Sequence, residues 1–213
     1  MNMLRAYWHW VVSALLIAAA IALGAVLTIN IVDTSFYRSR VSDGAGVLSG
    51  QAKDAIFSGN KSLDRARGCI IGVVTAEAEG AIADYAEKTF TDDHFGQNDL
   101  LLTLYPAERQ WYLSYGDRFA LYSSNELLQI VSAAAEGGLF DAPDENLPEL
   151  HETLSTWAMA HLPESGAELS REKPMSGASF LLVLLSFIAS LAAAAAIIRF
   201  AVIPLKLRKK PNG

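Results

Sequence analysis

Three aspartates are the residues of this sequence best placed to do chemistry, because each stands where a predicted strand or helix begins or ends. Asp43 precedes a predicted helix, Asp99 precedes a predicted strand and Asp117 follows another strand. Hard cations such as calcium bind several carboxylate oxygens together with backbone carbonyls and water. Asp99 and Asp117 are therefore candidate metal ligands, Asp43 is a third carboxylate at the end of an element, and calcium is the candidate ion. The alternative is that Asp43 caps a turn and that the other two are solvated.

The expected positions of these aspartates differ. Asp99 and Asp117 flank a predicted β-hairpin, so they should lie at the same edge of the sheet, where a shared cation could relieve their repulsion. Asp43 precedes a helix whose far end leads into the first strand. Simple antiparallel packing of that helix on the strand places Asp43 at the opposite edge, so spacing alone does not include Asp43 in the site.

Signatures of enzymatic catalysis are absent from the sequence. It contains no Gly-rich phosphate loop with a lysine, no nucleophile elbow and no pair of histidines at metal-ligand spacing. His151 and His161 fall on one predicted helix but face different directions, so packing or surface positions are expected for both. Cys69 opens an apolar strand and has no cationic neighbour in sequence, so it should be buried and unreactive. A single cysteine also excludes a disulfide within the chain.

The acidic charge is concentrated in the middle of the chain. Residues 33–173 contain all 23 acidic residues but only 11 of the 17 lysines and arginines, which gives this region a formal net charge of −12. Such a surface repels phosphate backbones, so a nucleic-acid partner is not expected. It suits cations or the basic surface of a partner protein.

Apolar residues are concentrated at the two ends of the chain. Residues 11–31 and 177–198 carry no charged side chain, and at 1.5 Å per residue each stretch can cross a hydrocarbon core about 30 Å thick. We therefore expect two helices that span a lipid bilayer. The alternatives are a cleavable signal peptide for the first stretch, which offers no clean cleavage site, and a buried core helix for the second, which lacks the polar stripe of such a helix.

The positive charges near the termini predict the orientation in the membrane. Arg5 precedes the first span, and Lys206, Arg208, Lys209 and Lys210 follow the second, so both termini should be cytoplasmic and the middle region extracytoplasmic. The expected order is an N-terminal stub and span (1–32), a globular domain (33–163), a linker (164–176), a second span (177–205) and a basic tail (206–213).

The globular region alternates predicted helices and strands. Apolar periodicity, capping residues and turn residues predict helices over 49–67, 81–90, 123–135 and 148–161, and strands over 69–75, 100–105 and 110–115. The helix between the first two strands makes them parallel, and the short turn at Pro106 makes the third strand antiparallel to the second. The fold class is therefore α/β, a small mixed sheet covered by helices on both faces in an α/β/α sandwich.

Several motifs of this region occur in a recognisable order. They are Val41-Ser42-Asp43-Gly44-Ala45-Gly46-Val47-Leu48-Ser49, Gly72-Val73-Val74-Thr75, Asp84-Tyr85-Ala86 with Phe90, Gly96-Gln97-Asn98-Asp99-Leu100-Leu101-Leu102 and Tyr115-Gly116-Asp117. Together they resemble the TPM domain family, over residues 33–162. The chain lacks the Gly-rich tail of many bacterial members, and Asp99 stands where the family usually has a glycine.

The resemblance implies an α/β/α domain that is often tethered to a membrane and faces a lumen or the cell exterior. It implies divided functions: plant members in the thylakoid lumen are associated with acid phosphatase activity and photosystem II repair, some members bind calcium, and an animal member modulates a receptor in the membrane. The resemblance also favours including Asp43 among the metal ligands.

The sequence as a whole favours a membrane accessory protein over an enzyme. We expect its acidic domain to bind a membrane protein partner or to help assemble a membrane complex, with calcium as the candidate cofactor and no organic cofactor. The alternative is a metal-dependent phosphatase that acts outside the cytoplasm and uses carboxylate-held cations to offset the charge of a phosphate.

Overall fold

The computed structural model describes residue 15 and residues 18–19, 21–27, 34–120, 124–164 and 177–197. The chain divides into two compact units. The central unit comprises residues 37–172, and the terminal unit combines residues 1–36 with residues 173–213.

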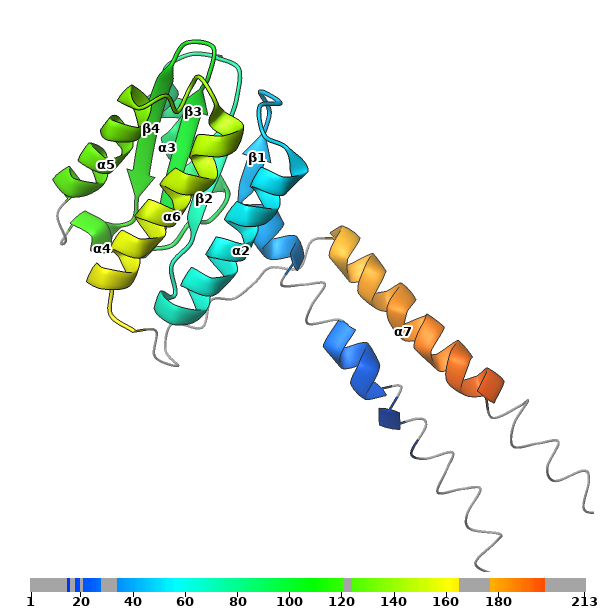
Figure 1. Cartoon of the computed structure of the whole chain (residues 1–213). Coiled ribbons are helices and arrows are strands. Elements are labelled where there is room, and N and C mark those ends of the chain that lie inside the picture. The colour runs from blue at the N-terminus through cyan, green and yellow to red at the C-terminus, as the bar shows by residue number, and fades with distance from the viewer. Residues whose placement is uncertain are drawn as a thin grey trace, which may run out of the picture. The chain divides into compact units, whose positions relative to one another are not determined.

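The central unit is built on a four-stranded mixed sheet with the strand order β1-β2-β3-β4 (Figure 1). The strands are β1 (Val41–Asp43), β2 (Ile71–Thr75), β3 (Leu100–Tyr105) and β4 (Gln110–Tyr115). The first three strands are parallel, and β4 pairs with β3 in an antiparallel hairpin. The expected parallel pair and the expected hairpin are both confirmed.

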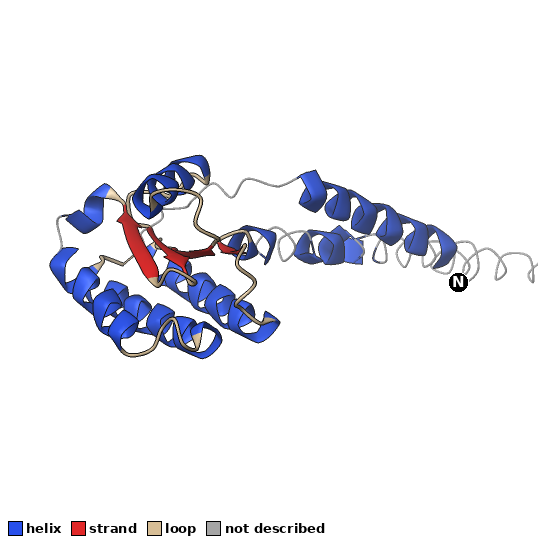
Figure 2. Ribbon diagram, turned by 90° about the horizontal axis from the view of Figure 1, so that it is seen from above, coloured by secondary structure: helices blue, strands red, loops and turns tan. Residues whose placement is uncertain are grey.

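Helices cover both faces of this sheet (Figure 2). They are α2 (Gly50–Arg67), α3 (Ile82–Asp92), the short α4 (Asp117–Ala120), α5 (Ser124–Glu136) and α6 (Pro143–His161). Helix α3 packs on β3 and β4, whereas α6 packs on β2 and lies between its neighbours α2 and α5. The expected α/β fold class, a mixed sheet with helices, is confirmed.

The core lies mainly between the sheet and the layer of α2, α5 and α6. Every residue of β2 and β3 is buried, as expected for strands covered on both faces. Alternate residues of these strands, such as Val73 and Leu102, pack against the helices together with Ile56 and Leu154. Cys69 is fully buried at the start of this core, which confirms its expected burial.

The ends of α2 follow from its sequence. The Ser49 hydroxyl accepts a hydrogen bond from the backbone N–H of Ala52 at 3.2 Å, which satisfies one of the free donors of the first turn. Gly68 closes the helix in the left-handed conformation at φ 62°, which glycine adopts without steric cost. Both caps are where the sequence predicts them. The expected cap of α5, Ser123, lies outside the described residues.

Two elements differ from the expectation. Helix α6 begins at Pro143 and not at Pro148, which lies inside the helix. Pro143 takes a first-turn position, where its missing N–H costs nothing, whereas Pro148 gives up one helical hydrogen bond in an otherwise well-packed helix. The strand β1 was not predicted. Its three residues are too short to show the alternation that identifies a strand, and its pairing with β2 decides its conformation.

The terminal unit contains helical residues at 21–27 and the helix α7 (Gly177–Ile197), which falls within the second expected span. Within the part of the chain that the structure describes, no helix is both long enough and apolar enough to cross a membrane. Most of the first expected span, residues 11–31, lies outside the described residues. The same is true of most of the N-terminal stub, the linker and the basic tail.

Candidate functional site

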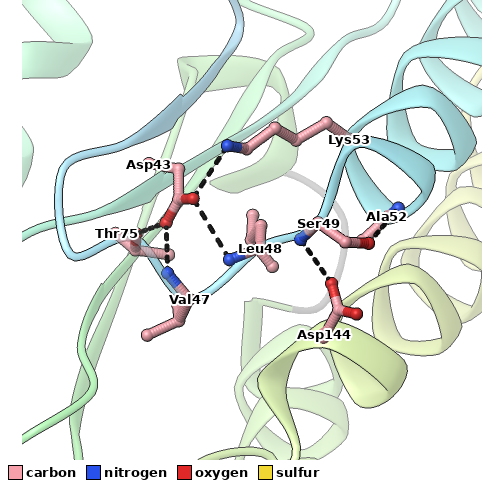
Figure 3. Close-up of polar contacts among 8 residues, drawn as sticks. All are labelled: Asp43, Val47, Leu48, Ser49, Ala52, Lys53, Thr75 and Asp144. Carbon is pink, nitrogen blue, oxygen red and sulfur yellow. Dashed lines mark hydrogen bonds and ion pairs between the residues drawn. The ribbon is translucent and has the colours of Figure 1, made fainter.

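Asp43 ends β1 at the carboxyl edge of the parallel strands, opposite Thr75 of β2. Its side chain is only 3% exposed. One carboxylate oxygen, Oδ1, accepts hydrogen bonds from Val47 N at 2.9 Å and from Thr75 Oγ1 at 2.6 Å. The other, Oδ2, accepts from Leu48 N at 3.1 Å and lies 2.8 Å from Lys53 Nζ (Figure 3).

These four donors determine the charge of Asp43. Burial opposes ionisation of the carboxyl group, but the hydrogen bonds from Lys53, Thr75 and the backbone of Leu48 and Val47 outweigh it and lower the pKa to about 2. The carboxylate is therefore ionised at neutral pH. An ionised carboxylate offers about four lone-pair directions, and here four donors occupy them. Asp43 is thus a structural acceptor that holds the turn before α2.

The turn at Asp43 is also fixed to α6. Asp144, in the first turn of α6, accepts a hydrogen bond from Ser49 N at 2.6 Å (Figure 3). Ser49 is the cap of α2, so one carboxylate links the starts of two neighbouring helices. The region 43–53 is consequently organised from within by Asp43 and from outside by Asp144.

Asp99 lies at the other edge of the sheet, directly before β3, and is fully buried. Its Oδ1 accepts a hydrogen bond from Ile70 N at 2.9 Å, and its Oδ2 accepts one from Gly96 N at 2.5 Å. Its backbone carbonyl accepts from Gly116 N at 3.0 Å. Asp99 therefore joins three chain segments: the approach to β2, the loop after α3 and the end of β4.

The glycine that follows β4 has a steric role in the same junction. A Cβ atom at Gly116 would collide with the backbone carbonyl groups of Gly96 and Gln97. Because these are backbone atoms, they cannot rotate away as a flexible side chain could. The motif Tyr115-Gly116-Asp117 thus places a glycine where two loops cross.

Asp117 begins the short helix α4 and is exposed. Leu100 pairs with Tyr115, so Asp99 and Asp117 flank the same end of the β3–β4 hairpin, as the sequence predicts. Asp43 lies at the opposite edge, so the structure does not bring all three candidate ligands together. Among the described residues, no group of three or more His, Cys, Asp and Glu side chains is placed to hold a metal ion. Calcium binding itself stays a prediction.

A buried polar network between α2 and α6 was not predicted. Asn60 of α2 accepts a hydrogen bond from Ile71 N at 2.8 Å and donates one to Ile71 O at 3.0 Å, so its amide imitates a neighbouring strand. His151 Nε2 lies 3.2 Å from Asn60 Oδ1. Burial lowers the pKa of His151 to about 4, so the ring is neutral at pH 7. Its Nε2–H can therefore donate to Asn60. The signal in the sequence was Asn60 in the apolar stripe of α2.

The outer surface of α5 and α6 carries charge of one sign. Neither helix contains a lysine or an arginine. Six acidic residues of the two helices are exposed: Glu126, Glu136, Asp144, Glu145, Glu149 and Glu152. The exposed charge of this acidic helix pair is therefore not balanced by any lysine or arginine of the same two helices.

Comparisons with known proteins agree with this fold. Residues 41–137 match the family described as TPM domain. The N-terminal domain of a protein from P. gingivalis, solved by NMR, is similar at 19% identity with a TM-score of 0.54, over 64% of this chain and 94% of that one. The BA42 protein from Bizionia argentinensis is similar at 15% identity with a TM-score of 0.50, over 60% of this chain and 91% of its own. No curated protein matches significantly. At these identities the two structures support the fold alone.

Proposed function

We propose that this chain, whose residues 41–137 match the TPM domain family, is a membrane-anchored accessory protein. Its domain binds a partner protein or helps assemble a membrane complex outside the cytoplasm. The acidic helix pair α5–α6 is the observation that carries the proposal. Six exposed carboxylates with no lysine or arginine on the same helices favour association with a basic surface.

The apolar surface of the terminal unit supports membrane anchoring. Of the 13 large apolar side chains that are exposed in the described part of the chain, 12 belong to residues 15–27 and 180–191, and only Leu128 belongs to the central unit. An exposed apolar surface of this extent needs a cover, and a lipid bilayer provides one. The charge pattern at the termini favours a cytoplasmic location for both ends.

The roles of Asp43 and Asp99 argue against catalysis by these carboxylates. Each is buried, and the oxygens of each accept hydrogen bonds from backbone N–H groups. A nucleophile or a general base needs a lone pair directed at its substrate. These carboxylates instead stabilise the loops that join the strands.

Co-purification tests the proposal. The full chain, with an affinity tag, is purified from gently solubilised membranes after mild cross-linking. We expect a defined membrane protein in constant ratio, and its recovery should fall at high salt because the contact is electrostatic. Absence of any such partner would overturn the accessory function. Turnover of phosphate monoesters with calcium, magnesium or manganese, lost in Asp117→Asn, would replace it with the phosphatase.

Topology has its own measurement. Single cysteines are placed at Ser42 and at Asn212 in a chain whose own Cys69 is buried, and intact cells are treated with a thiol reagent that cannot cross membranes. We expect labelling of the cysteine at position 42 only. Labelling at position 212 from outside would contradict the proposed orientation.

Calcium binding at the edge of Asp99 and Asp117 is part of the same proposal. The exposed carboxylate of Asp117 at this edge is its support. Calorimetric titration of the full chain with calcium should give a signal that Asp117→Asn abolishes. Equal binding by the two proteins would remove Asp117 from the set of ligands.

A further inference from the structure

A shallow groove runs between α5 and α6 on the outer surface of the helix layer. It has two adjoining parts, of about 290 Å³ and about 570 Å³, which share Ile130, Glu149 and Thr153 as lining residues. Its apolar lining residues, which we call its floor, are Ile130, Ala134, Leu150, Trp157 and Ala160. We call this the α5–α6 groove.

The rim of the groove is acidic. Glu149 and Glu152 project from the exposed ridge of α6, and neither forms an ion pair with another described residue. At the far end of the groove, Glu126 accepts a hydrogen bond from Trp157 Nε1 at 2.9 Å, which fixes the indole ring in the floor. The groove therefore combines a fixed apolar floor with two carboxylates free to meet a cation.

A second hollow lies on the other side of the same ridge, between α2 and α6. Its volume is about 440 Å³, and Ala55, Leu63 and Met159 line it together with Glu149 and Glu152. The two glutamates thus stand between two apolar hollows. A partner that lies along α6 can place apolar side chains in a hollow while its positive charges reach this ridge.

We propose that the α5–α6 groove docks a basic amphipathic helix of a partner protein. The groove follows α6 from Asn146 to Ala160, a length of about 21 Å at 1.5 Å per residue, which matches about four turns of helix. A helix that lies in a groove presents apolar anchors at helical spacing. Lysine or arginine beside those anchors complements Glu149 and Glu152, since neither wall of the groove contains a cation. This inference rests on the proposed function and specifies its partner site.

The test titrates a synthetic helix against the full chain in phosphatidylcholine nanodiscs. The probe is a fluorescent peptide of about 18 residues with leucine on one helical face and lysine on the other. A peptide of the same composition in scrambled order lacks the amphipathic faces and serves as its control. Fluorescence anisotropy reports binding, and empty nanodiscs correct for binding to lipid.

Three variants separate the groove from general acidity. The double variant Glu149→Gln with Glu152→Gln removes the rim charge, and Thr153→Trp fills the groove from an exposed position. Both variants should bind the amphipathic peptide with an affinity about tenfold lower than that of the unmodified chain. The matched control, Asp84→Asn with Asp92→Asn, removes the same charge from exposed positions of α3 on the other face of the sheet and should change binding less than twofold. Circular dichroism checks the folding of each variant.

Several outcomes would overturn the inference. One is equal affinity for the scrambled peptide, and another is an equal loss in the α3 control, because each shows attraction by charge alone. A third is full binding by the Glu149/Glu152 variant. Self-association of the chain that Thr153→Trp abolishes would assign the groove to a second copy of the chain. If the natural partner co-purifies undiminished with the Glu149/Glu152 variant, the groove assignment fails while the accessory function stands.

Discussion

Asp43 and Asp99 stabilise opposite edges of the same sheet through different kinds of partners. One donor to Asp43 comes from β2, and the others come from the ten residues that follow Asp43 in sequence, including the ammonium group of Lys53. Asp99 accepts instead from Ile70, at the approach to β2, and from Gly96, which lies three residues before it in the same loop. Asp43 thus receives most of its donors from the turn that follows it, and Asp99 joins its own loop to the approach to β2.

This difference predicts unequal consequences when each carboxylate is removed. Loss of the buried Asp43 carboxylate leaves its donors in a turn whose residues Gly44, Gly46 and Ser49 are exposed, so water can reach the turn and replace part of the lost hydrogen bonding. Loss of the acceptor at the fully buried Asp99 leaves two backbone N–H groups where water does not reach them. The full desolvation free energy of these groups then destabilises the fold. The junction should therefore tolerate substitution less well than the turn.

The largest expected effect is that of Asp99→Ala. It removes the acceptor of two backbone N–H groups at a site with no exposure, so we expect the free energy of unfolding to fall by about 3 kcal/mol. Denaturant unfolding of the full chain in detergent, followed by circular dichroism, measures the change. The exposed Asp117→Ala serves as the control and should change stability by less than about 0.5 kcal/mol. Equal effects of the two variants would show that Asp99 does not hold the junction.

The next effect is acid destabilisation through Asp43. Its pKa is about 2 in the folded chain and 3.8 as the ordinary value, so the unfolded chain binds the proton more readily. The stabilisation is complete above about pH 4 and is lost as the pH falls from 4 to 2. The loss should amount to about 2 kcal/mol.

Unfolding of wild type and Asp43→Asn at several pH values measures this loss. Buried His151, with a pKa of about 4, destabilises both proteins alike as the pH falls from 6.5 to 4, so the difference between the two proteins isolates Asp43. The free energy of unfolding of the variant should be lower than that of wild type by about 2 kcal/mol at pH 6 and nearly equal to it at pH 2. A constant difference at all pH values would contradict the assigned pKa.

The sequence predicts where the elements at these two edges lie better than it predicts which groups bind the carboxylates. Helix α2, its caps at Ser49 and Gly68, and the β3–β4 hairpin follow from local patterns and were predicted. The separation of Asp43 from Asp99 and Asp117 was also predicted from element order. That Asp43 caps a turn was one of the two alternatives that the sequence left open. The occupation of Asp99 by backbone donors was not predicted, because an aspartate before a strand looks the same whether its oxygens meet a cation or an N–H group. Only the positions of Ile70 and Gly96 in space decide this.

The same limit applies to the surface. The excess of acidic residues was evident in the composition, but the groove between α5 and α6 was not. The start of α6 was predicted at Pro148 and lies at Pro143, so a full turn of this helix, with Asp144 and its contact to Ser49, was missed. Pairing of helices that are separated along the chain depends on tertiary packing, which periodicity within one helix does not report.

The smallest effect sharpens the contrast between the edges by removing only the cation beside Asp43. In Lys53→Met the backbone and Thr75 donors to the carboxylate remain, and the Lys53 side chain is already 40% exposed and screened by water. We therefore expect a loss of only about 0.5 to 1 kcal/mol at low salt, which should shrink in 1 M sodium chloride. Lys61→Met, on the same helix and without an ion pair to any described residue, is the control. A loss as large as that of Asp43→Asn would mean that the ion pair, and not the backbone donors, holds the turn. The contrast would then be between an edge held by an ion pair and an edge held by hydrogen bonds from backbone N–H groups.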